Sequence, residues 1–141
     1  QHRGVARRVP TPARKIERGE TVTIYGPEKV LDFTYVDDCI SGLIAGIEKL
    51  AQGLVTNETI NLAAGKGYTL RQLVDMIASS LSVEPRVTCL PTRAGEVTRY
   101  VANISKAARL LGYKPGTTLE EGVTKEIQWA RSFRTGQKGK D

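Results

Sequence analysis

A short loop in the second half of the chain carries the residue types that suit a phosphorylated ligand with hydroxyl groups. Arg93, Gly95 and Glu96 follow Pro91 closely. An arginine offers a fork of hydrogen-bond donors to phosphate oxygens, and a carboxylate accepts hydrogen bonds from a diol such as that of a ribose. On spacing alone, this pattern is equally typical of an anion-binding loop and of an ordinary surface loop.

Two other patterns indicate chemistry less strongly. Asp37 and Asp38 could form a general acid/base pair, but helix capping and compensation of the helix dipole explain two adjacent carboxylates more simply. Gly65 and Gly67 precede a predicted helix, whose N-terminus could bind an anion. The full GxGxxG pattern of a dinucleotide site is absent from the chain, so we interpret these glycines as a plain turn.

Tyr25 and Lys29 have the YxxxK spacing of the catalytic pair in dehydrogenase/reductases. That pair needs both side chains on one face of a helix, so that the lysine lowers the pKa of the tyrosine. Gly26 and Pro27 stand between them, after a predicted strand. A strand and turn at these residues exclude the helical geometry, and we do not assign Tyr25 and Lys29 to that chemistry.

The composition excludes several classes of protein. The chain has 141 residues, of which 40% are hydrophobic and 26% charged, as expected of one globular domain with a core of its own. The single histidine, His2, excludes a multi-histidine metal site in this chain. Cys39 and Cys89 form no CxxC pattern, which indicates reduced thiols and a cytoplasmic location. No apolar run reaches the roughly 20 residues of a membrane span, and no secretory signal is recognisable.

The formal net charge of +6 comes from the two ends of the chain. Residues 1–19 and 131–141 are rich in arginine and lysine, whereas residues 20–130 are nearly neutral. A basic N-terminal arm could bind nucleic acid. No aromatic residue stands among the N-terminal arginines, however, which favours the interpretation that both ends are solvated termini. We therefore divide the chain into a basic segment (1–19), a folded domain (20–133) and a disordered tail (134–141).

Strands and helices alternate along the predicted domain. Strands are expected at residues 21–25, 32–36, 58–63 and 86–90. The first two helices are expected at residues 13–18 and from Asp37 or Asp38 to Gly53. Two more should follow the capping boxes of Thr69 with Gln72 and of Thr118 with Glu121. A short helix is expected at residues 105–111, with Asn103 or Ser105 as its cap. The second helix carries one apolar stripe: Ile40, Leu43, Ile44, Ile47 and Leu50. This order predicts an α/β or α+β fold.

Several segments in this order resemble the C-terminal half of the extended short-chain dehydrogenase/reductases, the NAD-dependent nucleotide-sugar epimerases and dehydratases that include UDP-glucose 4-epimerase. They are TIYG at 23–26, DFTYVDD at 32–38, INLAAG at 60–65, RAGE at 93–96, ANISKA at 102–107, LLGY at 110–113 and LEEG at 119–122. The resemblance covers roughly residues 12–133. It implies that the chain has the α/β fold class. Within that class it would be the small, mixed α+β substrate-binding subdomain, without the NAD-binding Rossmann half.

The resemblance implies that residues 20–133 bind a nucleotide sugar, most simply a UDP-sugar. By position, Tyr25 would pack against the base, Arg93 would contact the diphosphate, Glu96 the ribose and Tyr100 the hexose. The complete enzyme would use NAD, which this chain alone would not bind. It would oxidise the sugar transiently, reprotonate it or eliminate a group, and return the hydride.

The sequence departs from the family pattern in two ways. Leu31 stands where the family usually has an arginine that contacts the diphosphate, unless Lys29 supplies that contact from another angle. The glycine-rich NAD motif and the helical YxxxK of the family's N-terminal half are absent, so no catalytic, cofactor-binding or metal-binding residue is assigned. The chain would need a separate NAD-binding chain or region, or would form a homo-oligomer. The alternative is a non-catalytic nucleotide-binding or protein-interaction module derived from the family.

Overall fold

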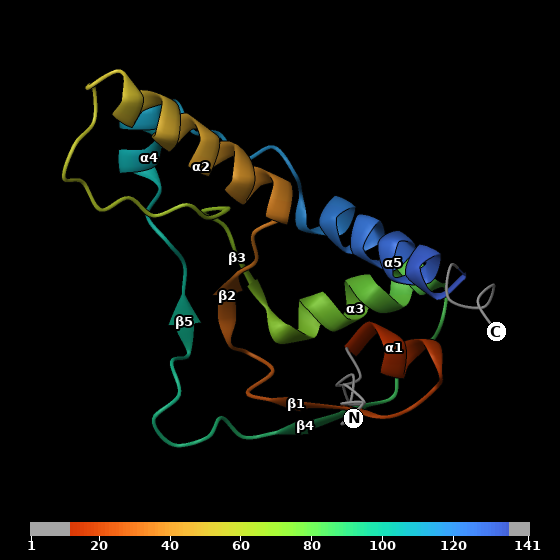
Figure 1. The fold of residues 1–141 in the computed structure, drawn as a ribbon. Helices are drawn as coiled ribbons and strands as arrows, with labels where there is room; N and C mark the ends of the chain where they lie inside the picture. Colours follow the sequence, from red (N-terminus) through yellow and green to blue (C-terminus); the bar gives the residue numbers. More distant parts are fainter. Residues whose placement is uncertain (1–11, 136–141) are drawn as a thin grey trace, which may run out of the picture.

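The computed structural model describes residues 12–135 of the chain (Figure 1). The helices are α1 (Pro12–Glu17), α2 (Val36–Ala51), α3 (Leu70–Leu81), α4 (Ser105–Leu111) and α5 (Leu119–Thr135). The strands are β1 (Val22–Tyr25), β2 (Val30–Asp32), β3 (Gly67–Thr69), β4 (Val87–Leu90) and β5 (Arg99–Tyr100). The predicted mixture of helices and strands is confirmed. Residues 1–11 and 136–141 of the predicted basic segment and tail lie outside the described residues.

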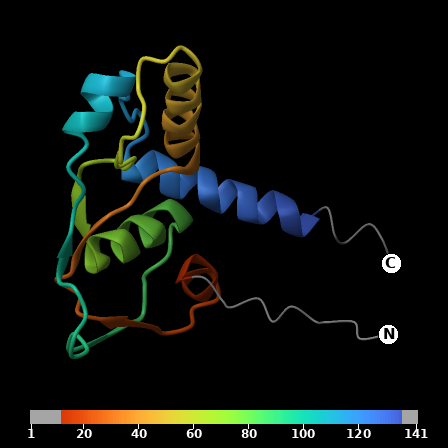
Figure 2. The ribbon, with the colours of Figure 1, turned by 60° about the vertical axis from the view of Figure 1, so that its left-hand side comes forward.

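The larger hydrophobic core joins α1, β1, α3 and α5. In β1 the alternate residues Val22 and Ile24 are buried, while α3 presents Val74 and Ile77 at helical spacing. Ile16 of α1 is 2% exposed, and it ties this short helix to the core. Figure 2 shows α1, β1, α3 and α5 in the same part of the molecule.

A smaller core joins α2 to α4. It is built around Ala107, Leu111 and Tyr113, which are all buried. The Tyr113 hydroxyl donates a hydrogen bond to the Ala63 carbonyl at 3.1 Å, and burial is the main reason that the pKa of this phenol is raised. Gly42 of α2 is buried against the same ring, which allows the helix to approach closely.

Two small sheets connect the two cores. Strands β1 and β4 pair in parallel, with Tyr25 opposite Leu90. In the second sheet, β2 lies between β3 and β5, antiparallel to β3 and parallel to β5. In this sheet Leu31 faces Tyr68 on one side and Tyr100 on the other.

The predicted strand at 32–36 is wrong, because the strand ends at Asp32 and α2 begins at Val36. The Asp32 carboxylate accepts hydrogen bonds from the backbone N–H groups of Ala64, Gly65 and Ala102, at 2.9 to 3.2 Å. These bonds fasten the end of β2 to two distant loops. An apolar, aromatic pattern alone did not reveal that the chain turns there.

The predicted strand at 58–63 is also wrong, because this segment follows an irregular path with no strand assigned to it. Side chains from elsewhere hold it instead: the Tyr113 hydroxyl donates to the Ala63 carbonyl, and Lys106 forms an ion pair with Glu58. The two-residue strand β5 was not predicted. The expected strands at 21–25 and 86–90 are confirmed as β1 and β4, each with slightly later starts.

The capping boxes are confirmed. The Thr69 side chain accepts from Gln72 N–H, and the Gln72 side chain accepts from Thr69 N–H. Thr118 and Glu121 make the same pair of bonds before α5. The predicted caps of α2 are wrong: Tyr35 is the N-cap residue, and it makes no side-chain capping bond. Its ring packs close to Gly122 of α5 instead.

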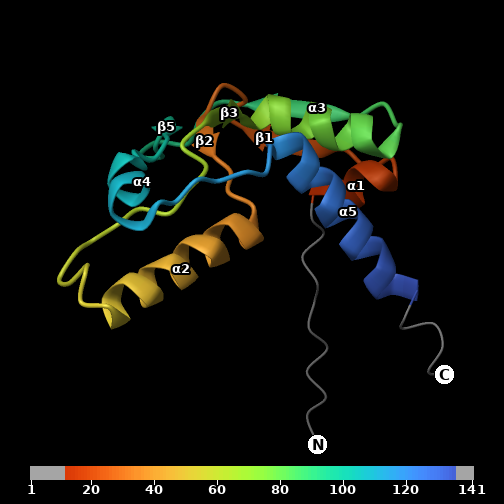
Figure 3. The same cartoon turned by 90° about the horizontal axis from the view of Figure 1, so that it is seen from above.

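The apolar stripe of α2 is exposed. Its residues expose between 45% and 67% of their surface, and they are Ile40, Leu43, Ile44, Ile47 and Leu50. Seen from above, α2 and α5 extend away from the rest of the fold in different directions (Figure 3). Among the described helices, none combines the length and the hydropathy that crossing a membrane would take.

Candidate functional site

The segment 93–96 forms a tight turn that brings the two side chains of interest to its ends. The Glu96 N–H donates a hydrogen bond to the Arg93 carbonyl at 3.2 Å. Gly95 has a φ of 82°, a left-handed conformation that favours glycine at this position of a turn. The turn therefore fixes the separation of Arg93 and Glu96.

Arg93 lies over the ring of Tyr25. The guanidinium carbon is 4.0 Å from the ring centroid, a cation–π contact. Tyr25 is half-buried at the end of β1, and its pairing with Leu90 of β4 brings the chain leading to Arg93 alongside it. The structure thus brings together two of the four residues predicted to bind substrate.

Glu96, at the other end of the turn, forms an ion pair with Lys29. The side chain of Lys29 is 10% exposed and that of Glu96 is 38% exposed. The hydrogen bond from Lys29 is the main reason that the pKa of the Glu96 carboxyl lies below its usual value. Among residues 12–132, whose burial the structure describes, Lys29 is the one polar or charged residue in the buried class.

Lys29 is held by its backbone as well as by Glu96. Its N–H donates to the Gly26 carbonyl at 3.0 Å, and its carbonyl accepts from Leu70 N–H at 3.1 Å. Gly26 has a φ of 66°, and a Cβ there would lie 2.8 Å from Lys29 Cε and 2.3 Å from Thr92 Oγ1. Glycine is therefore required at this turn, and the lysine stem packs closely against it.

Sequence reasoning considered Lys29 as the lysine of a YxxxK spacing, which it rejected, and as a substitute for the arginine missing at position 31. Its pairing with Glu96 spans 67 residues, so no local pattern reveals it. The only signal was a lysine next to a predicted strand and turn. Tyr25 and Lys29 lie on a strand and in the turn after it, which excludes the helical YxxxK geometry, as predicted.

Tyr100, the fourth predicted residue, lies on β5 with 66% of its surface exposed. The pairing of β2 with β5 places it opposite Leu31, where the family has an arginine. Tyr68 of β3 flanks Leu31 on its other side. Cross-strand partners point to the same face of a sheet, so Leu31 lies between two tyrosines on that face.

Asp38 anchors a loop and forms no acid/base pair. Its carboxylate accepts from the N–H groups of Gly116 and Thr117, both at 3.0 Å. Desolvation of the carboxyl raises its pKa, but these hydrogen bonds together outweigh it, so the pKa lies below its usual value. Capping of its own helix is therefore wrong for Asp38, because its carboxylate connects α2 to the segment before α5. Asp37 and Asp38 do lie in the first turn of α2, where carboxylates compensate the helix dipole, as expected.

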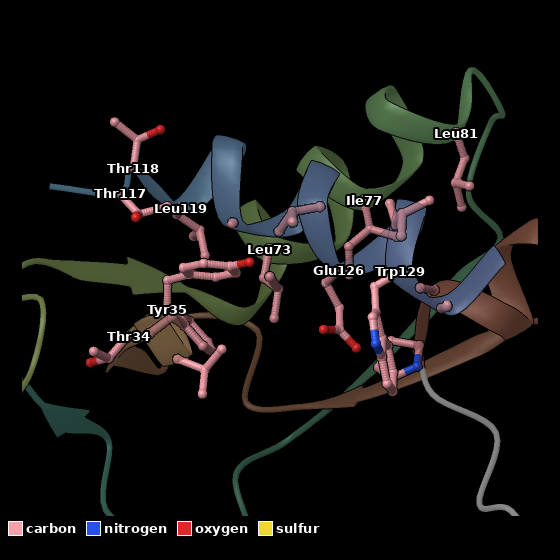
Figure 4. Close-up of a pocket in the computed structure, with 18 of the residues that line it drawn as sticks. Thr34, Tyr35, Leu73, Ile77, Leu81, Thr117, Thr118, Leu119, Glu126 and Trp129 are labelled. Carbon is pink, nitrogen blue, oxygen red and sulfur yellow. The ribbon is translucent and has the colours of Figure 1, made fainter. Parts of the chain in front are cut away.

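An apolar groove lies elsewhere in the described structure. It has a volume of about 830 Å³ and is bounded by α1, α3, α5 and the segment between β2 and α2. Figure 4 shows its mostly apolar walls, with Tyr35, Leu73, Ile77 and Trp129 around the opening. None of the four predicted substrate-binding residues lines it. Its apolar lining suits packing against protein better than binding a diphosphate.

The turn at Gly65 and Gly67 does not fit a dinucleotide. A dinucleotide site needs glycines that leave room for a pyrophosphate at the start of a helix. Gly67 leads into β3 instead, and the space beside it is filled by Val30 and Val101, which would lie 2.5 and 2.7 Å from a Cβ there. Within residues 12–135, no three His, Cys, Asp or Glu residues gather as a metal site would require.

Comparison with protein families gives a match over most of the chain. The model of the GDP-mannose 4,6 dehydratase family matches residues 1–126. An uncharacterized UDP-glucose epimerase of Bacillus subtilis is 32% identical over 117 residues, which are 82% of this chain and 36% of that protein. UDP-glucuronate 4-epimerase 5 of Arabidopsis thaliana is 30% identical, over 90% of this chain and 32% of its own length. The chain thus spans about a third of the curated relatives that it matches.

Solved structures show the same partial match. UDP-glucose 4-epimerase of Thermotoga maritima, solved with UDP-glucose, aligns with a TM-score of 0.77 and 29% identity, over 86% of this chain and 38% of that one. UDP-glucuronic acid 4-epimerase of Bacillus cereus, solved with NAD, aligns with a TM-score of 0.76 and 26% identity, over 88% and 38%. The mixed α/β fold described above is therefore shared with part of these epimerases.

Proposed function

This chain belongs to the extended short-chain dehydrogenase/reductase family of NAD-dependent nucleotide-sugar epimerases, and we propose that it is the C-terminal, nucleotide-sugar-binding part of such an enzyme. The observation that carries the proposal is the 93–96 turn, whose ends contact Tyr25 and Lys29. These residues combine an aromatic face, a guanidinium and a carboxylate within one surface region.

Each of these groups suits one part of a UDP-sugar. A ring such as Tyr25 stacks on a base, and the Arg93 guanidinium beside it offers paired donors to a diphosphate. Glu96 accepts hydrogen bonds from the ribose hydroxyls. Tyr100, which is exposed on β5, offers a phenol to the hexose. We assign substrate binding to these four residues and no catalytic step to any of them.

The NAD-binding part of the enzyme would be supplied by a region or chain outside these 141 residues. The chain spans about a third of its curated relatives, which leaves most of such an enzyme to be accounted for. Val36 lines the apolar groove and begins α2, whose apolar stripe is exposed. We propose that the NAD-binding part packs on the exposed stripe of α2, because an exposed apolar face is unfavourable in water.

One observation favours a second candidate, a non-catalytic module that binds nucleotides or protein. Leu31 removes a cation from the family's diphosphate site. A charge-assisted hydrogen bond of that kind contributes about 1.5–3 kcal/mol, so its loss weakens ligand binding. A binding module tolerates such a loss more easily than an enzyme does.

An amide-resolved NMR titration of the chain with UDP and then UDP-glucose tests the proposal. We expect a dispersed spectrum in which the amides of Tyr25, Arg93, Glu96 and Tyr100 shift on addition of UDP. Glucose alone is the control, and it should shift none of them at the same concentration. A dispersed spectrum that neither nucleotide changes would reject nucleotide-sugar binding and favour the protein-interaction module.

A further inference from the structure

Lys29 is an unusual residue for its place in this fold. An ammonium group is seldom buried unless it is paired, because desolvation of the charge is costly. Lys29 is 8% exposed, and its ammonium meets the Glu96 carboxylate at the turn that carries the proposed site. We propose that Lys29 is a positioning residue: it holds Glu96 by one carboxylate oxygen and so directs the other toward the ribose hydroxyls. This inference rests on the proposed function.

The geometry gives Lys29 little freedom. Its backbone is hydrogen-bonded to Gly26 on one side and to Leu70, at the start of α3, on the other. Its stem packs against Gly26, next to Thr92. A side chain fixed at its base and along its stem presents its ammonium in one place. Glu96 therefore pairs with a rigid partner rather than a mobile surface cation.

The ion pair leaves acceptor capacity on Glu96. The contact with Lys29 uses Oε2. A carboxylate has about four acceptor sites on its two oxygens, so one ion pair does not saturate it. The side chain remains 38% exposed, so a ligand in solution can reach it.

Lys29 also keeps Arg93 from pairing with Glu96. Arg93 stands at the other end of the same turn, and its charge contributes to lowering the pKa of Glu96. Because Lys29 already pairs with Glu96, the Arg93 guanidinium remains stacked on Tyr25. Without Lys29, Arg93 is the cation on this turn that could replace it. Removal of Lys29 would then draw both turn residues toward each other and away from a ligand.

The test compares the binding of UDP and 2′-deoxy-UDP to three forms of the chain by isothermal titration calorimetry. The forms are the wild type, Lys29→Met, which keeps the length of the side chain without its charge, and Lys114→Met as a control at an exposed lysine. We expect the wild type and the control to prefer UDP about tenfold, the value of one hydrogen bond to a charged group. In Lys29→Met the ratio of the two dissociation constants should fall toward one, and UDP itself should bind less tightly.

The preference for UDP over its deoxy analogue separates positioning from folding. Partial unfolding lowers the apparent affinity for both nucleotides equally and leaves their ratio unchanged. If Lys29→Met does not fold, Lys29→Gln, which keeps a polar group in place, is measured instead with the same expectation.

The remaining outcomes overturn one or both proposals. A wild type that binds neither nucleotide refutes the proposed function, and with it the role of Lys29. A wild type that binds both equally refutes the contact of Glu96 with the ribose. If Lys29→Met keeps the wild-type preference, Lys29 does not position Glu96. If the preference rises, Lys29 competes with the ligand for Glu96.

Discussion

Replacing Gly42 by alanine tests whether α2 is held against Tyr113 by the absence of a side chain. A Cβ at Gly42 would lie 2.6 Å from Leu62 Cδ2 and 2.9 Å from two ring carbons of Tyr113. Favourable contacts between carbon atoms are about 3.5–4.0 Å, so both neighbours would have to move. Leu62 is half-buried and can change its rotamer. The Tyr113 ring is 5% exposed and tied to Ala63, so it cannot move cheaply.

Gly46, one helical turn later on α2, is a matched control. A Cβ at Gly46 would meet only Leu111 Cδ1, at an ordinary 3.9 Å. Both substitutions gain roughly 0.5–1 kcal/mol from the higher helix propensity of alanine. Gly42→Ala also incurs an overpacking cost of about 1–3 kcal/mol. Because the propensity gain cancels between the two variants, their difference measures the overpacking alone.

The free energy of unfolding is measured by urea denaturation, followed by circular dichroism at the helix signal. We expect Gly46→Ala to match or exceed the stability of the wild type and Gly42→Ala to fall about 1–3 kcal/mol below Gly46→Ala. In thermal unfolding this difference is several degrees for a domain of this size. Equal stability of the two variants would show that α2 does not pack on Tyr113 as described.

Three further predictions concern the site, a loop anchor and the exposed helix face. Arg93→Ala should weaken UDP binding about tenfold or more in calorimetry, and Lys114→Ala should leave it unchanged. Asp38→Asn should lower the free energy of unfolding, measured by urea denaturation, by about 1 kcal/mol at neutral pH. Because the folded pKa of Asp38 lies below its usual 3.8, its stabilisation is present above that value and is lost as the pH falls through the folded pKa, so wild type and variant should converge in acid. Because this face of α2 is exposed when the NAD-binding part is absent, the isolated chain should self-associate through it. Leu43→Glu with Ile47→Glu should then abolish self-association in sedimentation velocity without lowering Tm, whereas an unchanged sedimentation profile would exclude α2 from the interface.

The parts of the fold that depend on nearby residues could be predicted from the sequence. Thr69 with Gln72 and Thr118 with Glu121 place the starts of α3 and α5 correctly, because both partners of each capping box lie within four residues. The alternation of Val22 and Ile24 likewise predicts β1, since a strand on a core needs little more than its own pattern.

The parts that failed depend on residues far apart in the chain. The end of β2 is set by hydrogen bonds that the Asp32 carboxylate accepts from backbone N–H groups at least 32 positions away. The segment 58–63 has the residue types of a strand, but its contacts run to side chains rather than to another strand. The exposed stripe of α2 shows the same limit, because periodicity predicts an apolar face without predicting what covers it.

The candidate site combines both kinds of information, which changes how its missing arginine is interpreted. A motif comparison reads Leu31 as the loss of one cation from the diphosphate site. The structure places Lys29 two positions earlier, where its ammonium pairs with the Glu96 carboxylate. Arg93 is then free to remain on Tyr25, at the face that a base and a diphosphate would share. In the proposed site the cation that would contact a diphosphate is therefore Arg93, and we expect its availability to depend on Lys29, which belongs to none of the motifs.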